Sequence, residues 1–406
     1  MAGPLAGIVV LDLSRILAGP WATQLLADYG AEVIKIEHPQ GGDDTRRWGP
    51  PYLRDTTGRD TGESAYFLSA NRGKHSVAID LSRPEGQALV RDLARQADVL
   101  VENFKVGGLA RYGLSYADLA PSCPRLVYLS ISAYGQDGPS AAEPGYDAMI
   151  QAQGGLMSIT GVPDGQPGAG PMKVGVAVAD LITAMYATSA ILGAIEQRHI
   201  SGRGQHIDIA LLDCLIALTS FQALNWFVSG EVPQRLGNAH PNIVPYQVFA
   251  CKGGYLILAV ANDGQFRSFC TAVDKPEWAD DERFAVGSAR GRNRQLLCGM
   301  VAELMLQRTM HEWIELLEGH NVPCGPINNI DQVFEDPQVQ HRGMRLQMPH
   351  PSGPLSLLAS PMRFADTPVR YELPPPLLGQ HTAEVLQQTL GLSADEVQAL
   401  RGRGVV

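Results

Sequence analysis

Asp180 is the residue whose surroundings most strongly indicate chemistry. Small and apolar residues flank it on both sides, in the run Val176-Ala-Val-Ala-Asp-Leu-Ile-Thr183. An ionised carboxylate in such surroundings needs either partners or a role. One interpretation is a helix N-cap, because an Asp between two apolar segments often serves as one. The other is a nucleophile at a helix N-terminus, where the dipole keeps the carboxylate ionised and backbone N–H groups receive a developing oxyanion.

A second acid and a set of cations complete the candidate groups. Asp147 follows Gly145 and Tyr146 and begins an apolar helical stretch, where it is either another cap or a functional group. Several cations lie at or just beyond the ends of expected strands, where open α/β sheets bind ligands. Each taken alone is more often a solvated surface charge, but together they could hold a polyphosphate. These cations are Arg15, Arg72, Lys74, Lys105 and Arg111.

Familiar motifs of other enzyme classes are missing from the sequence. There is no GxGxxG after the first expected strand, no Walker loop, no HExxH and no GxSxG. The histidines show no metal-ligand spacing, so we expect no metal. Glu37 closes the second expected strand, where a dinucleotide fold places its ribose acceptor, so an NAD-dependent oxidoreductase remains an alternative.

The segments that would position these groups alternate between strands and helices. Residues 7–13 and 30–37 are apolar runs that predict strands, and residues 21–29 between them predict a helix. Such a βαβ unit implies a parallel sheet, and therefore an α/β fold. Extended segments at 76–80, 99–102 and 126–132, with a helix at 84–96, continue the alternation.

Length and composition narrow the class of protein. The 406 residues favour two domains, and the hydrophobic content of 45% excludes intrinsic disorder. Nucleic-acid phosphates are bound by clusters of positive charge, and this chain has a net charge of −10, so no nucleic-acid partner is expected. Six cysteines without a CxxC pair and an N-terminus without a basic leader predict a cytoplasmic protein.

One apolar stretch needs separate treatment. Residues 174–195 are long and apolar enough to resemble a membrane span, but they include Asp180 and several Thr and Ser residues. We therefore predict a buried strand-turn-helix in a soluble core, and no membrane contact.

Changes in the pattern of apolar and polar residues along the sequence predict the domain boundaries. We expect a large domain to begin over residues 1–205, a linker helix over 206–224, a small domain over 225–330, and a linker and return to the large domain over 331–406. The polar loop at 237–247 lies between a long helix and a hairpin-like pair, and it is either a functional lid or a plain surface loop.

The sequence resembles the class III coenzyme-A transferases over essentially its whole length. The matching segments include residues 11–20, 30–37, 71–74, 102–104, 145–147, 154–155, 176–180 and 202–208. The resemblance implies a Rossmann-like large domain built from both chain ends, a smaller α+β domain, and an interlocked homodimer of ring-like subunits. The active site would lie between the large domain of one subunit and the small domain of its partner.

The resemblance also implies a reaction. Asp180 would attack a donor acyl-CoA and pass through an aspartyl anhydride and an aspartyl-CoA thioester, while Asp147 would orient Asp180 or an acyl group. Coenzyme-A thioesters would be substrates, with no tightly bound cofactor and no metal. Alpha-methylacyl-CoA racemase is the alternative within the family. Its proton-transferring histidine corresponds here to Tyr146, whose ordinary pKa of about 10 suits that role poorly.

Substrate contacts follow from the same resemblance. The positions expected to contact CoA are Arg15, Ala18, His38, Arg72, Lys74, Asn103, Phe104, Arg111 and Tyr146. Residues 43–51 and 237–247 look most like the subgroup that uses succinyl-CoA with dicarboxylic acid acceptors. Arg46 or Arg47 would hold the second carboxylate of the acid through a bidentate pair, and His240 or Asn242 would contact the acyl group.

Overall fold

The structure, a computed structural model, describes residues 3–406 and contains two compact units. The large unit combines residues up to Met157 with Lys173–Glu231 and Gln340–Val406. The small unit combines Ser158–Met172 with Val232–Val339.

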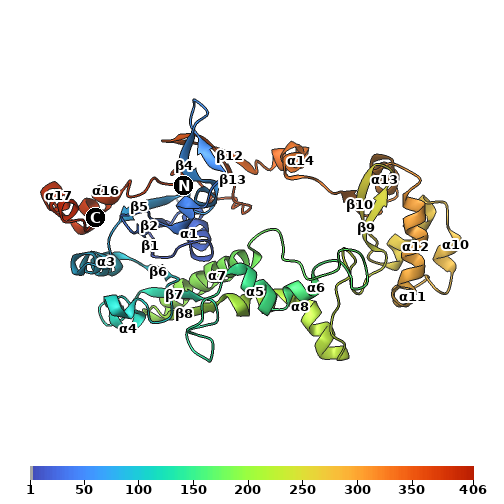
Figure 1. Ribbon diagram of the computed structural model, residues 1–406, viewed down its shortest axis with the longest axis horizontal. Helices are drawn as coiled ribbons and strands as arrows, with labels where there is room; N and C mark the ends of the chain where they lie inside the picture. Colours follow the sequence, from blue (N-terminus) through green and yellow to red (C-terminus); the bar gives the residue numbers. More distant parts are fainter. Residues whose placement is uncertain (1–2) are drawn as a thin grey trace. The chain divides into compact units, whose positions relative to one another are not determined.

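A parallel sheet of six strands forms the centre of the large unit (Figure 1). Its order is β5-β2-β1-β6-β7-β8, so the first strand is central and the connections reverse direction between β1 and β6. Four of the six strands are mostly buried apolar runs, as strands covered on both faces must be. The strands are β1 (Val9–Asp12), β2 (Glu32–Glu37), β5 (Lys74–Ala78), β6 (Val99–Glu102), β7 (Val127–Ser132) and β8 (His206–Ala210).

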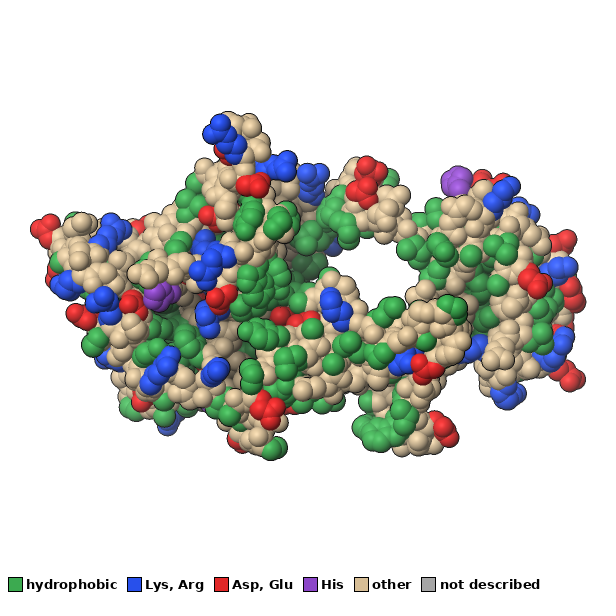
Figure 2. Space-filling model, viewed as in Figure 1, with side chains coloured by type: hydrophobic (Ala, Val, Ile, Leu, Met, Phe, Trp, Pro, Cys, Tyr) green, Lys and Arg blue, Asp and Glu red, His purple; other side chains and the backbone are tan. Residues whose placement is uncertain are grey.

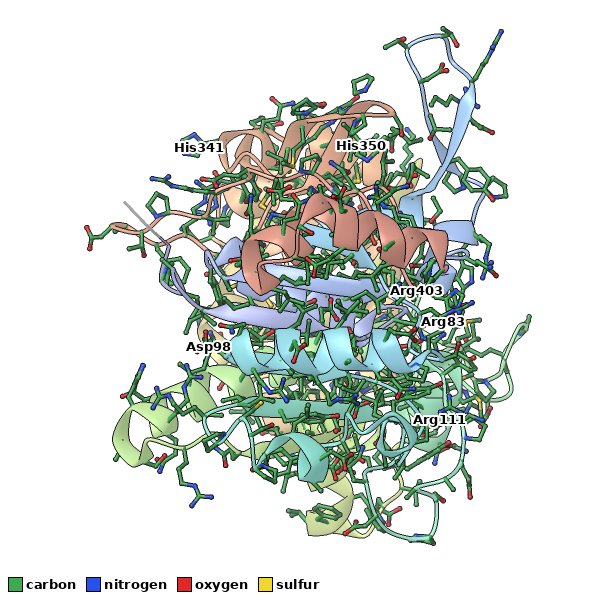
Figure 3. All side chains as sticks on the ribbon, turned by 90° about the vertical axis from the view of Figure 1, so that its left-hand side faces the viewer. Arg83, Asp98, Arg111, His341, His350 and Arg403 are labelled. Carbon is green, nitrogen blue, oxygen red and sulfur yellow. The ribbon has the colours of Figure 1, made fainter. Side chains whose placement is uncertain are left out.

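Helices cover both faces of this sheet. One face packs against α1 (Ala18–Asp28), α7 (Val178–Ser201) and the start of α8 (Leu211–Ser229), with α5 (Asp147–Gln153) beside them. The other face packs against α3 (Pro84–Gln96), α16 (Thr382–Leu390) and α17 (Ala394–Gly402). Figure 3 looks onto this second face and shows α3 and the C-terminal helices lying across the strands. The mixed α/β fold with a parallel central sheet is as expected.

The C-terminal segment belongs to the large unit because backbone hydrogen bonds attach it there. The N–H groups of Gly73 and Asp80 donate to the carbonyls of Leu373 and Val405, and His381 donates its backbone N–H to Ser76. A hairpin of β12 (Arg345–His350) and β13 (Gly353–Leu358) adds to this segment, and β3 (Tyr52–Arg54) with β4 (Asp60–Ser64) forms another. Neither hairpin was expected from the sequence, because the strands are short and carry little apolar alternation.

The small unit has an antiparallel sheet in the order β11-β10-β9 and several helices. Its elements are β9 (Tyr246–Cys251), β10 (Gly254–Ala259), α9 (Asp263–Ala272), α10 (Glu277–Asp280), α11 (Gly287–Arg292), α12 (Arg294–Met305), α13 (Met310–Glu318), β11 (Cys324–Pro326) and α14 (Ile330–Glu335). Residues 158–172 join this unit rather than the large one. Arg235 forms an ion pair with Asp164, and Gly237 donates its N–H to the carbonyl of Gly161.

The remaining short elements lie along the loops. They are η1 (Asp44–Arg47), α2 (Ala65–Ser69), η2 (Ala110–Tyr112), α4 (Tyr116–Leu119), α6 (Leu156–Ile159) and α15 (Pro337–His341).

Two predicted segments differ from the structure. Residues 174–177 do not form a strand, and α7 begins directly at Val178. Residues 206–210 are not part of a linker helix but form β8, the edge strand of the large sheet, because they pair with β7 over residues 128–132.

Both α7 and α8 are long and apolar enough to cross a membrane by length and composition alone. Half of the most apolar stretch of α7 is buried, as in the core helix of a folded unit, whereas little of that of α8 is. The helix α8 is also interrupted at Ser220, whose φ of 45° and ψ of −118° are not helical.

Candidate active site

Two adjoining pockets lie at the carboxyl ends of the strands in the large unit. The first, which we call the carboxylate pocket, has a volume of about 240 Å³ and is lined by Ala18, Asn103, Tyr146, Asp147 and Asp180 among others. The second, the cationic pocket, has a volume of about 520 Å³ and is lined by residues that follow β1, β2, β5 and β6. Open α/β sheets bind ligands at this edge, where the strand order reverses.

Three residues line both pockets and so connect them: Arg15, Phe104 and Lys105. His38 and Arg111 line the cationic pocket. In Figure 3, Arg111 lies at the end of the sheet opposite Asp98, which precedes β6, and this places it at the carboxyl ends of the strands. The pockets together therefore offer cations at one end and carboxylates at the other.

Asp180 is the third residue of α7 and is not its N-cap. The N-cap is Ala177, which has no polar side chain. Asp147 supplies the cap from outside the helix, because its Oδ1 accepts the N–H of Ala179 at 2.7 Å and that of Asp180 at 3.4 Å. The cap interpretation of Asp147 is therefore half right, since it caps α7 and not its own helix α5.

The Asp180 carboxylate accepts no hydrogen bond from the described residues. Burial in the pocket wall and, second, the charge of Asp147 raise the pKa of Asp180 to about 7. The helix N-terminus favours the ionised form of this carboxylate, whereas burial and the charge of Asp147 favour the protonated form. Both its protonated and its ionised forms are therefore populated near pH 7.

Tyr66 lies within electrostatic reach of the two carboxylates, although it lines neither pocket, and the sequence analysis did not find it. Burial, then the charges of Asp180 and Asp147, raise the pKa of this phenol to about 12, so its hydroxyl stays protonated and lies within electrostatic reach of both carboxylates. Its ring meets Trp48 edge to face at 5.1 Å. Nothing in the sequence separates Tyr66 from other aromatic residues, because only the tertiary fold brings α2 close to the start of α7.

The loop at residues 14–18, between β1 and α1, is held by polar contacts to its first three residues, Ser14, Arg15 and Ile16. The side chain of Asn103 brackets Arg15, accepting its N–H at 2.8 Å and donating to its carbonyl at 2.7 Å. Ile16 has a φ of 73°, which is uncommon for a β-branched residue, and both carboxylate oxygens of Asp43 accept its N–H. Lys35 holds Asp43 at 3.0 Å and donates to the carbonyl of Ser14 at 2.8 Å.

Lys35 and Asp43 belong to a larger set of buried charges, which we call the ion cluster. Its members, each at most 8% exposed, are Asp12, Lys35, Glu37, Asp43, Arg46 and Lys74. Burial alone would raise the pKa of Asp12, but Lys74, Lys35 and two hydroxyl donors lower it to about 2. Burial lowers the pKa of Lys74 to about 8, in spite of Asp12.

Four cations predicted to bind substrate lie outside both pockets. Lys74 is fully buried and donates to Asp12 and to the carbonyl of Pro20, and Arg72 is paired with Asp28. Their predicted contact with CoA is corrected to a structural role, because their donors are already used. Arg46 is buried against Glu37, and Arg47 is largely exposed, 3.6 Å from Asp44.

The remaining predictions concern Glu37 and the loop at 237–247. Both carboxylate oxygens of Glu37 accept hydrogen bonds from Arg46, and Ser76 and the N–H of Asp43 add two more, so the carboxylate is not available to a ribose. His240 and Asn242 lie in the small unit, where Nδ1 of His240 accepts the N–H of Asn242 and the His240 ring stacks on Tyr246 at 5.3 Å.

An open parallel sheet with cations at the switch point, and a carboxylate without a hydrogen-bond partner among the described residues, is typical of a site for an anionic ligand. The chain belongs to CoA-transferase family III, whose model matches residues 5–382. It is 49% identical over 386 residues to a succinate–glutarate CoA-transferase of Agrobacterium fabrum, covering 95% of each chain. It is 41% identical to the human succinyl-CoA:glutarate CoA-transferase, covering 99% of this chain and 90% of the relative.

A solved structure has the same fold. The crystal structure of a CAIB/BAIF family protein from Brucella suis matches with a TM-score of 0.83 and 45% identity, covering 96% of this chain and all of that one. The family assignment confirms the transferase prediction, and the NAD-dependent oxidoreductase alternative has no support.

Proposed function

We propose that this enzyme moves CoA from succinyl-CoA to a dicarboxylic acid, with Asp180 as the nucleophile. The relatives are named as succinyl-CoA or succinate:glutarate transferases, which supports the donor and the class of acceptor. The observation that carries the chemical role is the Asp180 carboxylate, which accepts no hydrogen bond from residues 3–406 and lines a pocket continuous with a cationic one.

The reaction needs no water, ATP or metal. The Asp180 carboxylate attacks the thioester carbonyl, CoA leaves as the thiolate, and a mixed anhydride forms. The thiolate then attacks the aspartyl carbonyl of that anhydride, which releases succinate and leaves an aspartyl-CoA thioester. The acceptor carboxylate attacks this thioester and expels CoA again. Attack of the thiolate on the acceptor acyl carbonyl of the second anhydride gives the product and restores the Asp180 carboxylate.

The pockets supply binding and positioning. Arg15 and Lys105 stand where the two pockets meet and Arg111 stands further along the cationic pocket, so they suit the phosphates of CoA. The pantetheine arm would pass Phe104, which lines both pockets, and deliver the thioester to Asp180. CoA thioesters are substrates in this scheme and no resident cofactor is required.

The second carboxylate of the acceptor needs a cation near the carboxylate pocket. Arg46 is unsuited, because Glu37 already holds its guanidinium in a buried bidentate pair. Arg47 is the better of the two candidates, because its side chain is exposed and its partner Asp44 lines the carboxylate pocket. Arg47→Gln should raise the KM for the diacid and leave the affinity for free CoA unchanged.

The racemase alternative receives no support from the carboxylate pocket. A two-base racemase needs a second proton-transferring group opposite the aspartate, and none of the residues lining this pocket is a histidine. Tyr146, at the corresponding position, is 64% exposed.

We further propose a homodimer, in which the partner's small domain covers the active site and brings the loop with His240 and Asn242. Large apolar side chains of α8 are exposed, including Phe221, Leu224, Trp226, Phe227 and Val228 (Figure 2). A monomer rarely exposes such a surface. The six free thiols support the cytoplasm as its location.

Trapping of the acyl-enzyme tests the proposed function. The protein is incubated with succinyl-CoA, quenched with hydroxylamine, and the modified residue is mapped by mass spectrometry. We expect a hydroxamate on Asp180 that is absent in Asp180→Ala and retained in Asp137→Ala, a matched change at an exposed position. An unmodified Asp180 together with exchange of the α-proton into solvent would favour the racemase.

A further inference from the structure

Gln151 is a fully buried side chain that joins the two helices carrying the site carboxylates. Its Nε2 donates to Oδ2 of Asp147 at 2.7 Å and to the carbonyl of Val176 at 3.4 Å. Its Oε1 accepts the N–H of Val174 at 2.9 Å. Only this orientation of the amide satisfies all three contacts, because a carboxylate and a carbonyl require a donor and an N–H requires an acceptor.

These contacts fix two things at once. The bond to Asp147 leaves the other oxygen of that carboxylate, Oδ1, facing the amides of Ala179 and Asp180. The bonds to Val174 and Val176 hold the backbone on both sides of Gly175, the segment that leads into α7. Gln151 therefore sets both the cap of α7 and the approach of the chain to that cap.

The helix α4 provides a comparison, because it also has an aspartate as its third residue but has no cap from another helix of the described chain. Asp118 is the third residue of α4, as Asp180 is of α7. Its carboxylate folds back and accepts the backbone N–H of Ser115 at 3.0 Å in a capping box. A carboxylate engaged in this way is held against its own helix and is a poor nucleophile. Asp180 makes no such bond, since the cap of α7 comes from Asp147.

We propose that Gln151 is a positioning residue of the transfer reaction, which keeps Asp147 on the α7 amides and so leaves the Asp180 carboxylate free to attack the thioester. This inference rests on the proposed function of Asp180. Gln151 does not line either pocket and touches no substrate in this scheme.

The test compares Gln151→Leu and Gln151→Glu with Gln153→Leu. Gln153 lies on the same helix α5 but is exposed, so its variant makes the same chemical change without the buried contacts. The measurements are kcat, the KM for succinyl-CoA, and the single-turnover rate at which the hydroxylamine-trapped adduct forms on Asp180.

We expect Gln151→Leu to lower kcat and the adduct rate by about 10²-fold, because the nucleophile loses its orientation, while the KM for succinyl-CoA stays within about twofold. Gln151→Glu keeps the shape but places a carboxyl against the Asp147 carboxylate. At low pH, a proton shared between the new carboxyl group and Asp147 preserves the hydrogen bond between the two side chains. At higher pH this proton is lost, and the two carboxylates repel each other. This variant should therefore gain a descending alkaline limb in its pH profile relative to the wild type.

The outcomes separate this inference from the proposed function. A wild-type enzyme that forms the Asp180 adduct, with an adduct rate in Gln151→Leu equal to that of Gln153→Leu, would overturn the role of Gln151 alone. Equal loss in Gln151→Leu and Gln151→Glu at every pH would also overturn it, because that result indicates general damage to packing. A wild-type enzyme without any adduct on Asp180 would overturn the proposed function and this inference together.

Discussion

The ion cluster around Asp12 and the carboxylate pocket around Asp180 belong to the same unit and treat charge in opposite ways. In the ion cluster, Asp12 receives hydrogen bonds from Ser14, Thr23 and Lys74, and its pKa falls to about 2. In the carboxylate pocket, Asp180 receives none from the described residues and lies near a second carboxylate, and its pKa rises to about 7.

The difference separates a structural charge from a reactive one. A buried carboxylate whose oxygens are engaged is costly to separate from its partners and cannot form a new bond without losing them. A carboxylate without partners is unfavourable in the folded state and is correspondingly ready to react. The ion cluster holds the loop at residues 14–18, and that loop forms part of the wall of the carboxylate pocket.

The largest expected effect comes from removing the reactive charge. Asp180→Asn should lower kcat by at least about 10³-fold, because the neighbouring Asp147 carboxylate is held by Gln151 and the α7 amides and cannot replace it as the nucleophile. The melting temperature should not fall, since the Asp180 carboxylate has no hydrogen-bond partner to lose within the described part of the chain. Initial-rate assays and differential scanning calorimetry measure the two effects, with Asp137→Asn as the control. Substantial residual activity would remove Asp180 from the reaction.

Removing the structural charge should give the reverse pattern. Asp12→Ala leaves Lys74 and Lys35 buried with one partner fewer, so the free energy of unfolding should fall by about 3–5 kcal/mol. Urea denaturation followed by circular dichroism measures the change. The double variant Asp12→Leu/Lys74→Met should recover part of the loss, because it removes both charges and keeps apolar volume. If the free energy of unfolding of Asp12→Ala equalled that of the wild type, the structural role assigned to the ion cluster would be contradicted.

The pH dependence of stability should have opposite signs at the two sites. The folded-state pKa of Asp180 is raised, so its contribution is most favourable below about pH 4 and is lost as pH rises through about 7. Asp180→Asn should therefore be more stable than the wild type at pH 8, by on the order of 1–3 kcal/mol. The folded-state pKa of Asp12 is lowered, so its contribution is present above about pH 4 and is lost as pH falls toward 2.

Calorimetry of the wild type, Asp180→Asn and Asp12→Asn across this pH range tests both signs. If the wild type and Asp180→Asn showed the same pH dependence between pH 4 and 8, the raised pKa of Asp180 would be contradicted.

The smallest effect is expected at the cationic pocket. Arg111→Gln should raise the KM for succinyl-CoA about tenfold and leave the KM for the acceptor acid and the adduct on Asp180 unchanged, because it removes one charge-assisted contact remote from the thioester. Arg292→Gln in the small unit is an exposed control. An increase in the acceptor KM alone would assign the cationic pocket to the acid instead.

The sequence predicted most of the central sheet because four of its strands are mostly apolar runs separated by helical segments, whereas β5 and β8 carry polar residues. It also indicated Asp180 as a candidate nucleophile, because its apolar neighbours are adjacent to it in the sequence. The contact of Asp147 with the amides of residues 179 and 180 could not be predicted, since it joins positions 32 and 33 residues apart. Lys74 was misassigned because a cation at a strand end has the same sequence pattern whether it faces a pocket or a buried Asp12.

The return of the C-terminal segment to the large unit constrains how the chain can fold during synthesis. Residues 340–406 complete that unit, and the carbonyl of Val405 accepts the N–H of Asp80, whose segment lines the cationic pocket. The small unit is encoded between these parts, so the ribosome releases it before the large unit has its last pieces. The first part of the large unit therefore exposes apolar surface until residues 340–406 have been synthesised. Early chain termination or slow synthesis of this last segment would then favour aggregation.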